Sequence, residues 1–227
     1  MKILAVDTAT LYGGVAVYDD EEGSLSEHRV GGQTRQFSES LMEMIDLCLK
    51  NLSFSIKDID CFAVTSGPGS FTGLRVGLST VKGLAFATSK PVVTVSTLFN
   101  HAMMFPFIDD DICPVLDARK KEVYSAIYRW NDGSLITVLE EGVFSIEELL
   151  RSIDRKTVFI GDGIKVYGDR VHDALKDNAR FAPASMYGGL PSTLARIAIQ
   201  KARNNEFTDL STFSPKYFRR SEAELKS

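Results

Sequence analysis

The sequence is poor in the side chains that form disulfides or hold metal ions. It has three cysteines and three histidines among 227 residues. Cys48, Cys61 and Cys113 each stand alone in an apolar run, and none belongs to a CxxC pair. This usage is typical of reduced core residues in a cytoplasmic protein, and it argues against a disulfide framework or a reactive thiol pair.

Common catalytic patterns are also missing. No His-x-x-x-His spacing exists, so no metal site is expected; the histidines are His28, His101 and His172. No Ser-His-Asp or Cys-His order stands out. Ser70 has a Gly-x-Ser context, but Phe71 follows where a nucleophile elbow needs glycine, so we expect Ser70 to cap a helix. Asp7 alone does not supply the clustered carboxylates of an RNase-H-type nuclease. We therefore assign no catalytic residue.

The chain lacks an excess of positive charge and lacks long apolar segments. Its formal net charge is −4, which argues against a protein that grips nucleic acid by itself over a broad basic face. RNA contact within a larger assembly stays possible. Asp7 interrupts the first apolar run, so we expect no secretory leader, and no run has membrane length.

A glycine-dense turn joins an apolar run, 61–64, to a helical pattern. It reads Ser66-Gly67-Pro68-Gly69-Ser70-Phe71-Thr72-Gly73-Leu74-Arg75. The N–H groups of such a turn can face an anion or a partner. A tight strand-to-helix turn, with glycine for positive φ, explains the same residues equally well. The turn is neither a Walker A loop, because no Gly-Lys-Ser/Thr follows, nor a dinucleotide fingerprint.

The two halves of the sequence resemble each other at an offset of 110 residues. The matched segments are Ile3-Leu4-Ala5-Val6-Asp7 with Cys113-Pro114-Val115-Leu116-Asp117, Ala16-Val17-Tyr18 with Ala126-Ile127-Tyr128, and Gly23-Ser24-Leu25 with Gly133-Ser134-Leu135. Each half opens with a buried strand that ends in Asp and returns as an alternating strand. A repeat of domain size indicates duplicated lobes that face each other across a cleft, and not a solenoid.

The strand ends of this repeat form a candidate nucleotide site. Asp7 and Thr8, followed by Gly13, occupy a hairpin of the kind that wraps phosphates in sugar kinases and actin, and Asp117 is the counterpart of Asp7. An Asx turn, in which Asp7 satisfies its own turn amides, is the alternative. At Asp117 the chain continues as Ala118-Arg119-Lys120-Lys121 without glycines, so these cations can instead neutralise its carboxylate.

Two helices of the first half combine an apolar stripe with small or soft residues outside it. Small residues four apart let another helix approach within about 8–10 Å, and methionines make adaptable contacts. The alternative is close packing on the chain's own sheet. We favour a partner interface on helices 38–52 and 70–89, with the following residues: Met42, Met44, Phe71, Gly73, Val76, Gly77 and Thr80.

The overall pattern predicts an α/β fold with mixed sheets covered by helices. We expect an N-terminal lobe, 1–106, and a C-terminal lobe, 107–227, with a mobile tail from Arg219. Expected strands are 2–7, 13–18, 26–30, 60–65, 91–95, 112–117, 123–130, 136–143 and 157–160. Besides 38–52 and 70–89, expected helices are 98–105, 146–152 after a Ser145–Glu148 capping box, one ending at 175, and a closing helix, 192–204, capped by Ser192.

Several of these segments resemble the bacterial TsaB (YeaZ) family. They are residues 1–10, 67–75, Val95-Ser96-Thr97-Leu98, Asp117-Ala118-Arg119 with Glu122-Val123-Tyr124, and Pro215-Lys216-Tyr217-Phe218-Arg219. The resemblance spans essentially the whole chain. It implies the two-lobed fold shared by actin, hexokinase and Hsp70 ATPases, with duplicated RNase-H-like lobes.

The resemblance also implies a function. TsaB proteins take part in forming N6-threonylcarbamoyladenosine in tRNAs that read codons starting with A. They are non-catalytic partners of the transferase TsaD, which they bind through the two N-lobe helices, and they assemble with the ATPase TsaE and tRNA. Alone they form homodimers. We assign no definite cofactor to the chain; ATP or ADP with Mg²⁺ at the level of the complex is left open, as is nucleotide binding by the chain itself.

Two other functions remain as alternatives. One is an ATP-binding phosphotransferase or ATPase that uses Asp7, and the other is an M22-type glycoprotease, which the missing histidine pair argues against. One local departure from the family is Phe37, which stands where members often have a histidine near the start of the first helix. That histidine is not a metal ligand in the family, so the change concerns the interface.

Overall fold

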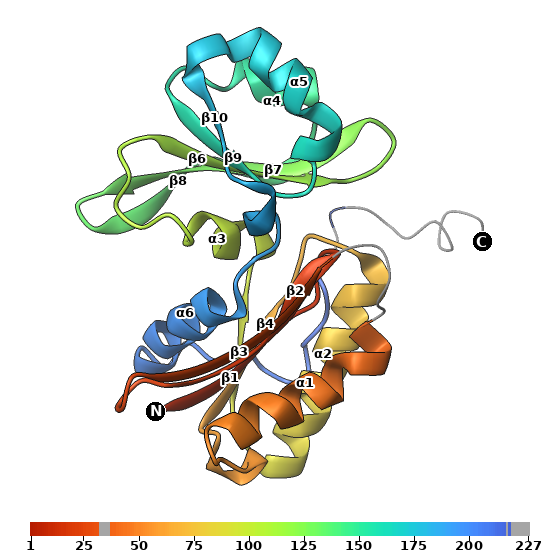
Figure 1. The fold of residues 1–227 in the computed structure, drawn as a ribbon, viewed down its shortest axis with the longest axis vertical. Helices are drawn as coiled ribbons and strands as arrows, with labels where there is room; N and C mark the ends of the chain where they lie inside the picture. The colour runs from red at the N-terminus through yellow and green to blue at the C-terminus, as the bar shows by residue number, and fades with distance from the viewer. Residues whose placement is uncertain (32–36, 217, 219–227) are drawn as a thin grey trace. The chain divides into compact units, whose positions relative to one another are not determined.

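The structure, a computed structural model, describes residues 1–31, 37–216 and 218, which form two compact units. One unit comprises Met1–Asn100 together with the described residues from Gly189 onward, and the other comprises His101–Gly188 (Figure 1). The expected C-terminal lobe, 107–227, therefore needs correction. Its closing helix belongs to the first unit, because that helix packs on the first sheet. The tail expected to be mobile, from Arg219, lies outside the described residues.

The first unit is built on a five-stranded mixed sheet in the order β3-β2-β1-β4-β5. The central strand β1 pairs antiparallel with β2 and parallel with β4. Its side chains are buried on both faces, because α1 and α2 cover one side of the sheet and α6 covers the other (Figure 1). The strands are β1 Lys2–Asp7, β2 Tyr12–Asp19, β3 Ser24–Gly31, β4 Cys61–Thr65 and β5 Val92–Val95.

The helices of the first unit are α1 Phe37–Asn51, α2 Phe71–Thr88 and α6 Pro191–Arg203. The apolar stripe expected on α1 is buried at Leu41, Ile45 and Cys48. α2 begins where expected, because the Ser70 hydroxyl accepts a hydrogen bond from the Gly73 N–H. Such a cap satisfies one of the amides that a helix start leaves unpaired.

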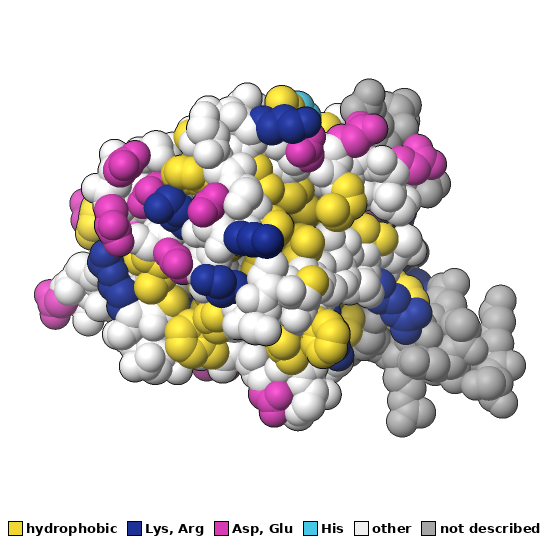
Figure 2. All heavy atoms as spheres, turned by 90° about the horizontal axis from the view of Figure 1, so that it is seen from below, with side chains coloured by type: hydrophobic (Ala, Val, Ile, Leu, Met, Phe, Trp, Pro, Cys, Tyr) yellow, Lys and Arg dark blue, Asp and Glu magenta, His cyan; other side chains and the backbone are white. Residues whose placement is uncertain are grey.

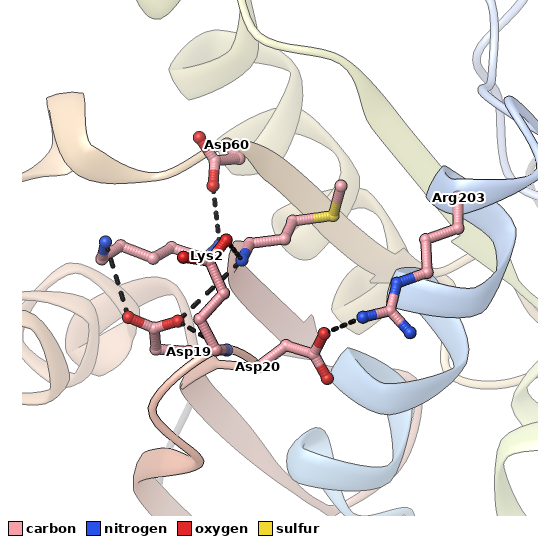
Figure 3. Close-up of polar contacts among 7 residues, drawn as sticks. Lys2, Asp19, Asp20, Asp60 and Arg203 are labelled. Carbon is pink, nitrogen blue, oxygen red and sulfur yellow. Dashed lines mark hydrogen bonds and ion pairs between the residues drawn. The ribbon is translucent and has the colours of Figure 1, made fainter.

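The N-terminus of α6 is capped by a neighbouring strand. Oε1 of Glu27, on β3, accepts hydrogen bonds from the Ser192 N–H at 2.9 Å and the Ser192 hydroxyl at 3.0 Å. The expected cap by the Ser192 side chain is therefore wrong: that hydroxyl donates to Glu27. At the other end of α6, Arg203 forms an ion pair with Asp20 beside the β2 end (Figure 3). Both ends of α6 are thus tied to the strands beneath it.

Polar contacts also fix the start of β1. The Lys2 N–H donates to Asp60 Oδ2 at 2.8 Å, and the Asp60 N–H donates to the Lys2 carbonyl at 2.9 Å. Lys2 Nζ lies 3.5 Å from Asp19 Oδ2 (Figure 3). Lys2 therefore connects the end of β2 to the residue that precedes β4.

The second unit repeats this topology. Its sheet has the order β10-β9-β6-β7-β8, with β6 antiparallel to β7 and parallel to β9. The predicted duplication of the fold is confirmed. The strands are β6 Asp111–Asp117, β7 Glu122–Asn131, β8 Ser134–Ser145, β9 Thr157–Ile160 and β10 Ala179–Phe181. The helices are α4 Ile146–Arg151 and α5 Ile164–Leu175, with α3 Thr97–Ala102 at the boundary of the units.

All three cysteines are buried. Burial raises the pKa of Cys61 and of Cys113 to about 12, and it also raises the pKa of Cys48. A thiolate is the reactive form of cysteine, so these thiols are poor nucleophiles in the folded protein. Their packing agrees with the core role predicted from the sequence.

Candidate functional site

The Asp7 carboxylate is fully buried, and both of its oxygens accept hydrogen bonds. Oδ1 accepts from the Ala9 N–H at 3.1 Å and from the Thr65 hydroxyl at 3.0 Å. Oδ2 accepts from Asn100 Nδ2 at 3.1 Å. The bond to Ala9 is the Asx turn that the sequence left as an alternative. Thr65 ends β4 and Asn100 lies on α3, so the carboxylate holds three segments of the first unit together.

Thr8 connects the same turn to α2. Its hydroxyl donates a hydrogen bond of 2.7 Å to the Gly73 carbonyl. A Cβ at Gly73 would lie 2.1 Å from the Thr8 carbonyl oxygen, and a Cβ at Gly77 would lie 2.4 Å from the Thr8 hydroxyl oxygen. Contacts this short do not occur with real Cβ atoms, so both glycines are required for α2 to approach the turn.

The glycine-dense turn packs against the same residues. The Ser70 N–H donates to the Ala9 carbonyl at 2.6 Å, and a Cβ at Gly69 would lie 2.2 Å from that oxygen. Gly69 also has a φ of +159°. The glycines of residues 66–77 therefore let the turn and α2 lie directly on the 7–10 loop. Close packing, and not an anion cradle, explains this part of the motif.

These contacts bear on the three residues of the first unit that were predicted to bind a nucleotide, Asp7, Thr8 and Gly13. Asp7 and Thr8 are buried, and their polar side-chain atoms bind protein groups. Gly13 is buried as well, and a Cβ there would lie 2.2 Å from the Asp7 carbonyl oxygen, so this glycine serves the hairpin. The arrangement of these three residues does not fit direct binding of Mg²⁺ or nucleotide phosphates.

Asp117, the counterpart of Asp7 in the second unit, has different hydrogen-bond partners. Asp117 Oδ1 accepts from the Arg119 N–H at 2.9 Å, and Oδ2 lies 3.7 Å from Arg119 Nη1. The cation expected to neutralise Asp117 is therefore in place. Residues 119–121 all have positive φ, between 52° and 64°. The backbone therefore makes this turn in the left-handed region without a glycine.

Asp162 lies beside Asp117. Its Oδ1 accepts a hydrogen bond of 3.2 Å from the Asp117 N–H, and burial raises the pKa of Asp162 above its ordinary value. The negative charge of Asp117 acts in the same direction. The sequence did not single out Asp162, although its place in the Gly161–Gly163 turn after β9 matches the place of the glycine-dense turn after β4.

The expected partner interface divides into inward and outward residues. Met44 is buried in the core of the first unit, with 3% of its surface exposed, so its assignment to a docking surface is wrong. Gly77 is buried as well, and the space that its missing side chain leaves is filled by Thr8 of the same chain, so its assignment is also wrong. Gly73 packs against Thr8 too but is half-buried, and its place in an interface stays a prediction.

The outward residues remain candidates. Met42 is exposed, while Phe71, Val76 and Thr80 are half-buried on α2. The structure adds Phe86, which is 83% exposed, and Gly83, where a Cβ would have nothing within 4 Å. Neither residue was predicted from the sequence, although Phe86 lies outside the apolar stripe of α2. In Figure 2, hydrophobic side chains on the face seen from below lie among charged ones.

The described residues contain neither a membrane-spanning helix nor a cluster of metal ligands. No helix among them is long and apolar enough to span a membrane. Within the same part of the chain, no three or more His, Cys, Asp or Glu side chains are grouped closely enough to hold a metal ion.

Comparisons with known proteins match this chain to TsaB proteins and to the transferase TsaD. A family model described as TsaD, tRNA N6-adenosine threonylcarbamoyltransferase, matches residues 28–227. The Bacillus subtilis tRNA threonylcarbamoyladenosine biosynthesis protein TsaB is 29% identical over 100% of this chain and 97% of its own length. Escherichia coli TsaB is 30% identical over 82% of this chain and 83% of its own length. A Persephonella marina tRNA N6-adenosine threonylcarbamoyltransferase is 28% identical over 88% of this chain and 65% of its own length.

Solved structures of similar fold include a YeaZ-like protein. A Pseudomonas aeruginosa protein described as similar to peptidase YeaZ aligns with a TM-score of 0.82 and 26% identity, covering 96% of this chain and 99% of its own. An activator of 2-hydroxyisocaproyl-CoA dehydratase from Clostridium difficile, with bound ADPNP, aligns over 91% of this chain and 97% of its own with a TM-score of 0.51 at 8% identity. That second likeness concerns the fold alone.

Proposed function

The chain belongs to the TsaB (YeaZ) family, and on that premise we propose that it is a non-catalytic partner of a TsaD transferase in the formation of N6-threonylcarbamoyladenosine in tRNA. TsaD transfers the threonylcarbamoyl group, and this chain supplies a surface on which TsaD is held. TsaE and tRNA join the same assembly, and the chain forms a homodimer in the absence of TsaD.

The observation that carries the non-catalytic role is the state of Asp7. In the first unit this carboxylate accepts three hydrogen bonds from Ala9, Thr65 and Asn100 and has no exposed surface. A carboxylate that binds a metal ion or positions a nucleophile needs an oxygen directed at the ligand. Asp7 instead acts as a structural link, which favours a protein that has kept the fold for a purpose other than turnover.

The surface that we propose for TsaD is the outward face of α2 with the neighbouring exposed part of α1. Phe86 and Gly83 are exposed on α2, outside its buried stripe, and Met42 is the exposed methionine of α1. Large exposed apolar side chains are uncommon in patches on a surface without a partner. A glycine beside them allows the backbone of another helix to come close.

The test uses three single variants in a pull-down with TsaD and in reconstituted tRNA modification. Gly83→Glu places a charge on the proposed surface, at a position with open space around the new side chain. We expect it to weaken TsaD binding by about tenfold or more, because an unpaired charge would be buried. Gly83→Ala controls for the added side chain, and Val166→Glu, at an exposed apolar position of α5, controls for the added charge.

The outcome separates the candidate functions. Wild-type binding and wild-type modification by Gly83→Glu would remove this face of α2 from the TsaD interface. An ATP-binding phosphotransferase or ATPase would instead bind Mg-ATP tightly as an isolated chain and lose that binding in Asp7→Ala. Calorimetric titration of the isolated protein with Mg-ATP distinguishes this function from ours, under which no such Asp7-dependent binding is expected.

A further inference from the structure

The segment that follows α6 is bound to the edge of the first sheet. Its Thr208 N–H donates to the Val92 carbonyl at 2.8 Å, and its hydroxyl accepts from the Thr94 N–H at 3.1 Å. Val92 and Thr94 belong to β5, the last strand of the sheet. Thr208 therefore satisfies groups on the outer edge of β5, as an added strand would do.

The segment then turns and packs against the core. Asp209 accepts hydrogen bonds from the Ser211 N–H and hydroxyl, both at 2.8 Å, and these bonds hold a tight turn. Leu210 and Phe213 are partly buried and pack against the apolar core of the first unit. Two apolar side chains within and just after an Asx turn give the segment a fixed path.

The segment reaches the glycine-dense turn at Lys216. The Lys216 N–H donates to the Ser66 carbonyl at 2.8 Å, and the Lys216 carbonyl oxygen would lie 2.7 Å from a Cβ at Gly67. Gly67 has a φ of +117°, which residues with a side chain rarely adopt. The backbone of the segment, and not the Lys216 side chain, makes this contact.

The turn beneath Lys216 leads directly into α2. Leu74 lies on the first turn of α2, and its Cδ1 is 3.4 Å from the Cβ position of Gly67. Gly67 is the residue that the Lys216 carbonyl contacts. The Ser66 N–H donates to the Val95 carbonyl, and the Thr97 N–H donates to the Gly67 carbonyl. The turn is therefore held by β5 and α3 on one side and by Lys216 on the other.

We propose that residues 208–216, here called the C-terminal strap, position α2 for its partner by holding the glycine-dense turn. This inference rests on the proposed function, because it takes α2 as the surface for TsaD. It goes beyond that function by assigning a role to residues that lie outside both helices of the interface. The strap contributes through backbone hydrogen bonds, so its effect depends on the Lys216 N–H and not on the lysine charge.

Two variants at one position separate these contributions. Lys216→Pro removes the N–H, because proline has no backbone donor. Lys216→Ala keeps the N–H and removes the ammonium group, which lies 5.0 Å from the centroid of the Phe218 ring. Hydrogen exchange is measured over residues 66–74, and TsaD affinity is measured by titration.

We expect Lys216→Pro to speed exchange in residues 66–74 and to weaken TsaD binding, each by about tenfold, because local opening of the turn becomes easier. Lys216→Ala should match the wild type in both measurements. Val171→Ala, a cavity in the core of the second unit, serves as a control that lowers stability without touching the turn. It should leave exchange in 66–74 and TsaD affinity unchanged.

A chain that ends at Ser214 provides a second test if Lys216→Pro does not fold. It keeps Leu210 and Phe213 and lacks the Lys216 contact, and it should behave as Lys216→Pro is expected to. Unchanged exchange at residues 66–74 in either variant would overturn the strap. Failure of the wild type to bind TsaD would overturn the proposed function, while the exchange measurement would still decide whether the strap holds the turn.

Discussion

The hydroxyl of Thr8 donates a 2.7 Å hydrogen bond to the carbonyl of Gly73, a residue 65 positions away on the first turn of α2. This bond joins the strand that ends in Asp7 to the helix that follows the glycine-dense turn. The two elements come this close because positions 73 and 77 carry no side chain. The most distinctive motif of the sequence therefore serves the contact between two elements of one unit.

Replacement by alanine should have opposite effects on the free energy of unfolding at Gly77 and at Gly83, two glycines of α2. Gly77→Ala would bring a Cβ to 2.4 Å from the Thr8 hydroxyl oxygen, and we expect a loss of about 1–3 kcal/mol in the free energy of unfolding. Gly83→Ala meets open space and should stabilise the protein by about 0.5–1 kcal/mol, because alanine favours helix. Urea denaturation measures both. A neutral Gly77→Ala would refute the close packing described here.

Removing the Thr8 hydroxyl should weaken the same contact. Thr8→Val keeps the shape but has no donor for the Gly73 carbonyl, so we expect a loss of about 0.5–1.5 kcal/mol. Thr8→Ser retains the hydroxyl and should retain the hydrogen bond. Combined with Gly77→Ala in a double-mutant cycle, Thr8→Val should give a non-additive energy, since both changes act on one contact. Additive losses would place the two effects in separate interactions.

The cap that β3 supplies to α6 gives a third prediction. Glu27→Ala leaves the Ser192 N–H and hydroxyl without their acceptor and should cost about 2 kcal/mol, the upper part of the range for a lost cap, because the charge is lost as well. Glu27→Gln keeps an amide oxygen at the same place and should lose only the interaction of the charge with the helix dipole, about 0.3–1 kcal/mol. Denaturation at low and high salt checks this. Salt should reduce the difference in stability between Glu27→Gln and the wild type, whereas most of the loss in Glu27→Ala should persist.

Local patterns predicted most of the fold. Alternating apolar strands, the Ser70 cap and the Ser145–Glu148 capping box each depend on neighbouring residues, and all are present. The strand β10 was not predicted, because its three residues, Ala179-Arg180-Phe181, are too few to establish an alternating pattern and two of them are exposed. The Ser192 cap was assigned wrongly, because the real acceptor, Glu27, is 165 residues away in the sequence.

The candidate site was predictable only in part for the same reason. The sequence offered an Asx turn at Asp7, which is local and correct, but it gave no sign of Asn100, which lies 93 residues away. The direction that a small residue faces on α2 also depends on tertiary packing. Met42 and Met44 are two residues apart on α1, yet one is exposed and the other is buried. Composition placed the small and soft residues on two helices that the structure contains, α1 and α2, but could not assign each residue to a face.

The cysteines should be unreactive in the folded protein. Burial raises the pKa of Cys61 and of Cys113 to about 12, so almost no thiolate exists at neutral pH, and Cys48 is also buried. We expect a thiol reagent to modify the native protein only as fast as it unfolds, and to modify all three thiols at once in denaturant. A single thiol that reacts rapidly under native conditions would contradict the packing of that cysteine.

The pH dependence of stability should change when Asp162 is replaced by Asn. Burial raises the pKa of Asp162 above its ordinary 3.8, so the folded state disfavours the charged carboxylate. As the pH rises from the unfolded pKa through the folded pKa, the unfolded chain releases this proton first, and native stability falls. Asn cannot ionise and can still accept the Asp117 N–H. We therefore expect the stability of Asp162→Asn relative to the wild type to be greater at neutral pH than at a pH below 3.8. Denaturant midpoints across this range test the sign, and a relative stability that instead falls as the pH rises would show that the Asp162 charge stabilises the fold.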